Sequence, residues 1–227
     1  MSDTSSDHIQ SHPCRVGFVV GLAAEARIAA RCSDRVVAGG GTPTGAFEAA
    51  RTLLADGAKA LVSFGLAGGL DPAMRPGALL IPSRILHNGR TIAADLRLSQ
   101  QFGGLTGHTL LAGAAIIADR AAKRALYENT GAHAVDLESG AVAEVAAAHK
   151  VPFTAVRAIC DPAERCLPQA ALIALDARGR ISLLRVLASL ARQPSQIGDL
   201  LRLGRDAASA RGALLKAVEH FVRQGSA

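Results

Sequence analysis

Aromatic and charged residues are both scarce in this sequence of 227 residues. Aromatics make up 3% of the chain, with no tryptophan and a single tyrosine, and charged residues make up 19%. Hydrophobic residues reach 49%, which excludes a disordered solvating chain and favours a globular protein with a closely packed aliphatic core. The length suits one domain with a sizeable core.

Signals for export, membrane insertion and structural metal binding are also lacking. The first dozen residues are polar, and no apolar run reaches the ~18 residues of a membrane span. No pair among the four cysteines has CxxC spacing, so neither a zinc knuckle nor a thioredoxin motif is predicted. We therefore expect a cytoplasmic protein with reduced cysteines and no metal site.

Short apolar runs alternate with Ala-rich helical patterns along most of the chain. Strands are predicted at 16–22, 60–65, 78–82, 84–87, 132–137 and 152–159, and helices at 23–31, 42–56, 119–130 and 138–149; residues 109–117 form another apolar stretch. This alternation predicts an α/β protein with a mostly parallel sheet. Only helices are expected after the last strand, at 168–177, 181–192, 196–204 and 206–223. Residues 1–13 are predicted to be a disordered leader and residues 14–227 a single domain.

Positive charge is concentrated near the C-terminus. The formal net charge is +6, and the segment 178–223 alone contains nine Lys or Arg and three acids, so the rest of the chain is neutral. This basic helical arm could pack on the sheet with a solvated cationic face, or it could rest on anionic lipid headgroups. Nucleic acid is not expected as a partner, because stacking aromatics and a binding motif are missing.

Three acidic residues follow or end predicted strands. Glu25 comes after the first strand, Glu138 after the strand at 132–137, and Asp161 at the end of the last strand. Ligands of open α/β sheets bind outside the carboxyl ends of the strands, where three carboxylates could share one crevice. The alternative is that each acid caps a helix N-terminus.

A glycine-rich stretch at 65–69 follows a buried strand and is predicted to open a loop over 66–72. Glycines let backbone N–H groups approach an anion or a sugar closely. The stretch has neither P-loop nor GxGxxG spacing, so it could equally be a simple turn.

Four segments resemble the purine nucleoside phosphorylase/5′-methylthioadenosine nucleosidase superfamily, in the order that this family shows. They are VGFVVGLAAEA (16–26), SFGLAGGLDPAMRPGALLIP (63–82), HAVDLESGAVAEVA (133–146) and VPFTAVRAICDPAE (151–164). The last two are the most specific. The resemblance implies a three-layer α/β/α sandwich with a mixed central sheet, a helical C-terminal extension and a homodimer, with no metal or organic cofactor.

The resemblance also implies roles for individual residues. Asp161 matches the acid that protonates the leaving purine at N7, Glu138 the carboxylate that holds the ribose hydroxyls, and Glu25 the group that orients the attacking water. Ala67 and Gly68 are expected to line the ribose side of the pocket. Burial of Asp161 would raise its pKa and favour the protonated form that this role needs.

Three positions depart from the family pattern. Cys160 replaces the serine that helps to position the acid, and a thiol is a weaker donor. Leu137 replaces a methionine, and Ile116 stands where the family carries an aromatic residue that stacks on the base. These three residues and Phe153 complete the expected substrate-binding set.

The acceptor of the ribosyl group is left open between water and phosphate. A carboxylate at position 25 repels phosphate and suits water, whereas Arg27 and Arg84 could serve an anion. We therefore expect hydrolysis, with phosphate as the alternative co-substrate.

The C-terminal arm resembles the hopanoid-associated phosphorylase branch of the superfamily. That resemblance implies a lipid-linked nucleoside, adenosylhopane, as substrate, and a protein that is peripheral at the inner membrane face. A methylthioadenosine/adenosylhomocysteine nucleosidase is the first alternative, and a non-catalytic nucleoside- or lipid-binding module is the second.

Overall fold

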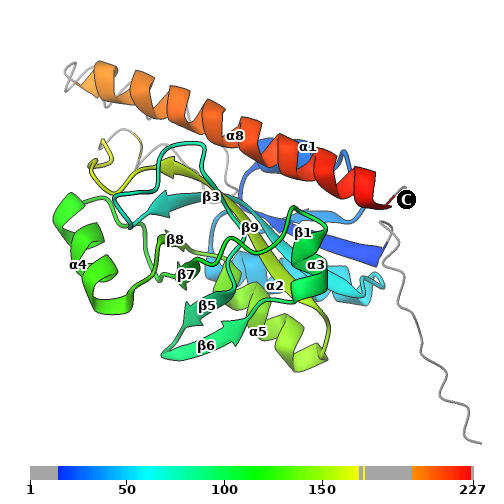
Figure 1. Ribbon diagram of the computed structural model, residues 1–227. Coiled ribbons are helices and arrows are strands. Elements are labelled where there is room, and N and C mark those ends of the chain that lie inside the picture. The colour runs from blue at the N-terminus through cyan, green and yellow to red at the C-terminus, as the bar shows by residue number, and fades with distance from the viewer. Residues whose placement is uncertain (1–14, 169–170, 172–195, 226–227) are drawn as a thin grey trace, which may run out of the picture.

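A mixed nine-stranded sheet forms the centre of the protein (Figure 1). The computed structural model describes residues 15–168, 171 and 196–225. The strands are β1 (Val16–Val20), β2 (Val36–Ala38), β3 (Ala60–Gly69), β4 (Leu79–Leu80), β5 (Arg84–His87), β6 (Arg90–Ala93), β7 (Thr109–Ala112), β8 (Ala134–Asp136) and β9 (Phe153–Asp161). Their order is β2-β1-β3-β8-β7-β5-β6, with β9 paired to β3 and β4. The sheet is mixed because β8 runs antiparallel to β3, whereas β1 and β9 run parallel to it.

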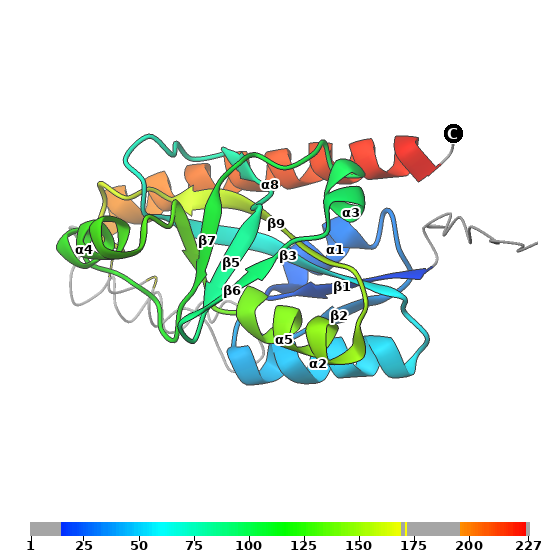
Figure 2. The ribbon, with the colours of Figure 1, turned by 60° about the horizontal axis from the view of Figure 1, so that its bottom comes forward.

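Helices cover both faces of this sheet and give the three layers expected from the sequence. The helices are α1 (Ala23–Ala29), α2 (Pro43–Ala55), α3 (Leu96–Gln100), α4 (Arg120–Thr130), α5 (Ser139–His149) and α8 (Ile197–Gly225). Figure 2 shows α2 and α5 side by side on one face, with α1 and α8 on the other. The α/β/α sandwich is therefore confirmed.

Two hydrophobic clusters, one on each face, hold the layers together. Small side chains of α2 and α5, mostly Ala and Val, fill one cluster. The other contains an aromatic group in which the ring of Phe18 lies 5.8–6.0 Å from the rings of Phe64, Phe102 and Phe221. Five of the six phenylalanines are buried, so the few aromatics of this chain are used mainly in the core.

The last helix differs from the prediction. One continuous helix, α8, replaces the two predicted at 196–204 and 206–223. A glycine inside a helix costs only about 1 kcal/mol, and Gly204 is the only interruption between them. The C-terminal half of α8 buries Ala210, Leu214 and Phe221 in the core, so this part is integral to the fold.

Several other features of the fold were not predicted from the sequence. β3 continues to Gly69, whereas a loop was predicted from residue 66 onwards. Residues up to Gly68 still pair with β9, and Gly68 and Gly69 both pair with β8. The short elements β2, β6 and α3 were not predicted. β6 lies at a sheet edge and is mostly exposed, so it lacks the apolar run by which buried strands are found.

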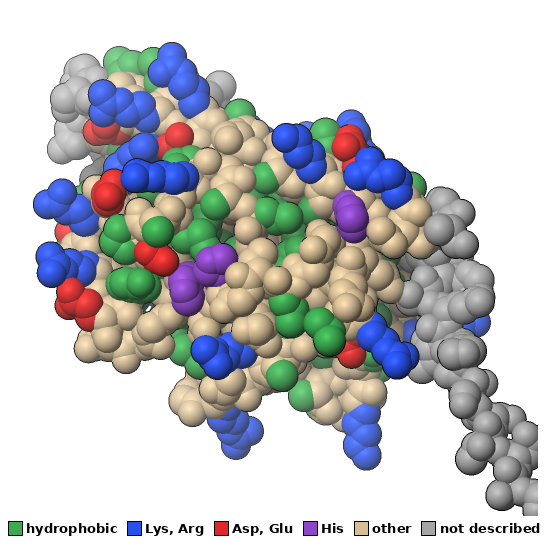
Figure 3. All heavy atoms as spheres, viewed as in Figure 1, with side chains coloured by type: hydrophobic (Ala, Val, Ile, Leu, Met, Phe, Trp, Pro, Cys, Tyr) green, Lys and Arg blue, Asp and Glu red, His purple; other side chains and the backbone are tan. Residues whose placement is uncertain are grey.

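Several predictions fall on parts of the chain outside the described residues. These are the leader at 1–13, the helix at 181–192 and nearly all of the helix at 168–177. On the face drawn in Figure 3, Lys and Arg side chains are dispersed rather than gathered in one patch. Among the described helices none is long and apolar enough to cross a bilayer. Contact of the basic arm with a membrane surface, and a homodimer, stay predictions.

Candidate active site

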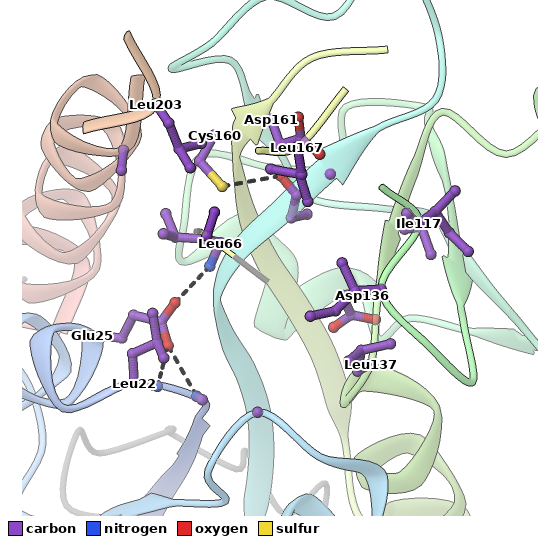
Figure 4. Close-up of a pocket in the computed structure, with 18 of the residues that line it drawn as sticks. Leu22, Glu25, Leu66, Ile117, Asp136, Leu137, Cys160, Asp161, Leu167 and Leu203 are labelled. Atoms are coloured by element: carbon purple, nitrogen blue, oxygen red, sulfur yellow. Dashed lines mark hydrogen bonds between the residues drawn. The ribbon is translucent and has the colours of Figure 1, made fainter. Parts of the chain in front are cut away.

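A cavity of about 540 Å³ opens where β1, β3, β8 and β9 end. Its size falls in the range of small-molecule sites. All three acids singled out in the sequence line it, Glu25, Glu138 and Asp161, and each is buried. Figure 4 shows Glu25 and Asp161 on either side of Leu66, which lies in the C-terminal half of β3. The expected convergence of the three carboxylates is therefore found.

The antiparallel pairing of β8 with β3 brings Glu138 to this place. Val135 and Ala134 pair with Gly68 and Gly69, so β8 runs back along β3 and its next residues reach the end of β1. A Cβ atom built on Gly21 would lie 2.9 Å from Glu138 Oε1, which places this carboxylate directly over the end of β1. Glu138 thus reaches the site from an antiparallel strand, whereas Asp161 ends the parallel strand β9 and Glu25 lies in α1, which follows the parallel strand β1.

Glu25 has both a capping and a cavity-lining position. Its Oε2 accepts hydrogen bonds from the backbone N–H groups of Gly21 and Leu22, at 2.9 and 2.7 Å, and its Oε1 accepts one from Leu66 at 2.8 Å. The first two bonds cap α1, so the capping interpretation is correct for this residue. Burial raises the pKa of Glu25, although the charge of Arg157 and these three donors oppose the rise.

Glu138 occupies the N-cap position of α5, but its side chain does not cap the helix, because it makes no capping hydrogen bond. Its Oε2 accepts from Arg157 at 3.4 Å, and its buried Oε1 has no partner among the described residues. Burial raises the pKa of Glu138 to about 7, helped by the negative charges of Glu25 and Asp136 and opposed by Arg157. Near neutral pH the Glu138 carboxyl can therefore both hold and release a proton.

In the described part of the chain, the guanidinium of Arg157 is the one that pairs with the carboxylates around Glu138. Arg157 lies in β9 and is 1% exposed. It forms ion pairs with Asp136 and Glu138, and it also donates to Ser63 and Ser139. One positive charge faces three acids here, so the cluster is electron-rich enough to stabilise positive charge in the adjacent cavity.

Asp161 is held by a buried lysine. Lys123 Nζ donates to Asp161 Oδ2 at 2.6 Å, whereas the buried Oδ1 has no partner among the described residues. Burial raises the pKa of Asp161, and the hydrogen bond and charge of Lys123 oppose the rise. No helix begins at Asp161, so the capping interpretation is wrong for this residue.

Cys160 does not hold Asp161. Its thiol points to the carbonyl oxygen of Ala67, 3.7 Å away. Burial raises the pKa of the Cys160 thiol to about 12, and the nearby charges of Asp161 and Glu25 add to the rise, so it stays neutral. The side chain that contacts the Asp161 carboxyl is that of Lys123, whereas the thiol of Cys160 contacts the backbone of Ala67.

The other predicted substrate-binding residues divide into two groups. Five line the cavity: Ala67, Gly68, Ile116, Leu137 and Cys160. Phe153 does not, and its assignment is wrong. It begins β9 whereas Asp161 ends it, so the two lie roughly 26 Å apart along the strand, and Phe153 is buried in the core.

Sequence reasoning missed three functional candidates: Lys123, Asp136 and Arg157. Arg157 had a usable signal, because it is a lone cation inside an otherwise apolar buried strand. Asp136 lies two residues before Glu138 in a quoted motif. Lys123 had no usable signal in the sequence, because one lysine on an Ala-rich helix is typical of a solvated face. In the described part of the chain, no group of three or more metal-binding side chains occurs.

Gly21 offers a test of the Glu138 position. A methyl group there would lie 2.9 and 3.1 Å from the two oxygens of Glu138, which ends a flexible side chain and can move. We therefore expect Gly21→Ala to lower kcat at least tenfold with little change in melting temperature, since electrostatic stabilisation depends on position. An exposed control, Gly57→Ala, sits in a turn with φ of +87° and should cost stability but not activity. Unchanged turnover by the Gly21 variant would contradict the placement.

Three buried carboxylates around one cavity, at the ends of strands in an α/β sandwich, define a site equipped for acid–base and electrostatic catalysis. The family comparison is consistent with this class. The model of the Phosphorylase superfamily matches residues 18–106 and 106–192, which is most of the chain. The protein belongs to the phosphorylase superfamily. No curated protein matches it.

Solved structures share the fold at low sequence identity. The 5′-methylthioadenosine/S-adenosylhomocysteine nucleosidase of Neisseria meningitidis, in complex with methylthio-immucillin-A, has a TM-score of 0.66 at 14% identity, covering 92% of this chain and 98% of that one. The corresponding nucleosidase of Campylobacter jejuni has a TM-score of 0.60 at 17% identity, and the match covers 83% of this chain and 99% of that one. Futalosine hydrolase of Helicobacter pylori has a TM-score of 0.62 at 14% identity, and the match covers 91% of this chain and 97% of that one.

Proposed function

We propose that the protein hydrolyses the N-glycosidic bond of an adenosine that carries an apolar 5′ substituent, releasing adenine. One observation carries this proposal: Glu138 Oε1 and Asp161 Oδ1 are both buried without a hydrogen-bond partner among the described residues, on side chains that line one cavity. Buried acceptors left unpaired are costly, so they point to ligand groups that bind there. A ribose hydroxyl can donate a hydrogen bond to Glu138 Oε1, and the protonated Oδ1 of Asp161 can donate one to purine N7.

The three acids can divide the reaction between them. As the bond between C1′ and N9 breaks, positive charge grows on the sugar and negative charge on the base. Asp161 donates its proton to N7, so adenine leaves neutral, and Glu138 stabilises the sugar cation electrostatically. Glu25 orients a water, takes its proton, and the remaining hydroxide oxygen bonds to C1′.

Water is favoured over phosphate as acceptor by the charges around the cavity. Four carboxylates line it, Glu25, Asp136, Glu138 and Asp161, and among the described lining residues Arg211 is the one cation. Neither Arg27 nor Arg84, the two cations considered for an anion, lies among them. Arg157 and Lys123 pair with the last three of these carboxylates, whereas Glu25 forms no ion pair with a described residue, so a phosphate dianion at the position of the attacking group would be repelled by Glu25 and a water would not.

The rest of the cavity is apolar and suits a hydrophobic 5′ group. Its apolar side chains come from several elements: Leu22, Leu66, Ile116, Ile117, Leu137, Leu167, Leu200 and Leu203. Together with the resemblance to the hopanoid-associated branch, this lining makes adenosylhopane the first substrate to test. The second candidate is methylthioadenosine or adenosylhomocysteine, favoured by the shared fold of the nucleosidases named above.

The test is adenine release from adenosylhopane and from methylthioadenosine, each with and without phosphate. We expect release from the lipid nucleoside at a rate that does not depend on phosphate. Leu203→Ser should lower kcat/KM for the lipid about tenfold and leave methylthioadenosine unaffected, because Leu203 lines the apolar region. The control is Leu201→Ser, on the same helix but 59% exposed.

Each other outcome would change the proposal. Strict phosphate dependence would overturn the role of Glu25. Release from methylthioadenosine alone would leave the second candidate, and release from neither substrate would favour a non-catalytic binding module.

A further inference from the structure

Lys123 is a buried ammonium whose donors are all used. It is fully buried on the first turn of α4, which Asp119 caps by accepting from the backbone N–H groups of Ala121 and Ala122. Its Nζ donates to Asp161 Oδ2 at 2.6 Å, and to the carbonyl oxygens of Pro162 and Arg165 at 3.1 and 2.9 Å. An ammonium has three N–H groups, so these three acceptors fix its position and satisfy its charge.

The ion pair between Lys123 and Asp161 uses only one of the two oxygens of the Asp161 carboxyl. Lys123 occupies Oδ2 of Asp161 and leaves Oδ1 without a partner among the described residues. Lys123 does not line the cavity, whereas Asp161 does. We propose that Lys123 is a positioning residue for the base-protonating acid, holding Asp161 by Oδ2 so that Oδ1 is presented to the leaving purine. This inference rests on the proposed function.

The positive charge of Lys123 also favours the product of proton transfer. When Asp161 gives the proton on Oδ1 to N7, the carboxyl becomes a carboxylate, and Lys123 keeps its three protons and pairs with it. A fixed charge that is already in place stabilises this carboxylate without reorganisation. Lys123 therefore makes Asp161 a stronger acid than burial alone would leave it.

Among the described residues, few other charges face Asp161. Arg165 follows on the adjoining loop and is paired with Asp206 of α8, so their charges largely offset each other. Cys160 precedes Asp161 as a neutral thiol. Lys123 is thus the main charged group in contact with this carboxyl.

The experiment compares Lys123→Gln with the wild type. Glutamine keeps N–H donors for the two carbonyls but removes the charge. We expect kcat for base release to fall at least tenfold, KM to change less, and the pH at which Asp161 loses its proton to rise by about one to three units. The control is Arg124→Gln, which removes an exposed charge one residue further along α4 and should change neither quantity.

Two further measurements keep the test decisive. A carbon-13 NMR titration of the Asp161 carboxyl, assigned with Asp161→Asn, follows the proton directly and needs no substrate. Adding Lys123→Gln to Asp161→Asn should cause no further loss of kcat, since the lysine acts through the acid. Lys123→Arg restores the charge if the glutamine variant does not fold.

The outcomes separate this inference from the proposed function. An unmoved Asp161 titration in Lys123→Gln, or a further loss of kcat in the double variant, would overturn the role of Lys123. No base release by the wild type would overturn the proposed function instead, and the titration would still show whether Lys123 controls the Asp161 proton.

Discussion

Asp161→Asn is expected to lower kcat for adenine release by about 10²- to 10⁴-fold, the usual contribution of a general acid. Asparagine keeps the size of the side chain and an oxygen for Lys123, so the cavity should keep its shape. It has no proton of suitable acidity to give to N7, and adenine would then have to leave as an anion. KM should therefore change much less than kcat.

The pH dependence of the same reaction adds a second readout. Glu138 must be ionised to stabilise the sugar cation, and its pKa is raised to about 7, so the rate should fall as the pH falls through about 7. Asp161 must be protonated, so the rate should also fall as the pH rises through its elevated pKa, and this dependence should vanish in Asp161→Asn. The exposed Asp34→Asn is the matched control. Asparagine at 161 with near-normal turnover would exclude Asp161 as the acid.

The α/β class and the three acids could be predicted because each leaves a local signal. Buried strands appear as apolar runs, and Glu25, Glu138 and Asp161 each interrupt or end one. The continuation of β3 to Gly69 could not be read locally, because it depends on pairing with β8 and β9, which are distant in sequence. For the same reason Phe153 was misplaced, since a motif does not say which end of its strand faces the ligand.

The cations of the site were harder to predict than the acids. Lys123 and Arg157 are recognisable only by what they contact, and their partners lie 38 and 19–21 residues away. Burial of a charge is tolerated only with a partner, so the acids in effect determine where these cations sit. The charge state of the site is therefore a property of tertiary structure.

Arg157→Met is expected to destabilise the fold by about 3–5 kcal/mol at pH 8, which is the usual cost of removing one partner of a buried ion pair. Asp136 and Glu138 would lose their direct ion-pair partner, and Glu25 the positive charge that favours its ionised form. Methionine fills similar space, so the loss is mainly electrostatic. Urea unfolding of the variant and the wild type measures it.

The loss of unfolding free energy in Arg157→Met should be larger at high pH than at low pH. Without Arg157 the pKa values of Glu25 and Glu138 would rise further, so the folded variant would bind more protons than the unfolded chain. Its stability should then fall as the pH rises, and the deficit should be smaller at pH 5.5 than at pH 8. Arg90→Met, an exposed arginine at the sheet edge, should cost little at either pH. A deficit that does not change with pH would mean that Arg157 acts by packing, and that the acids of the site do not depend on its charge.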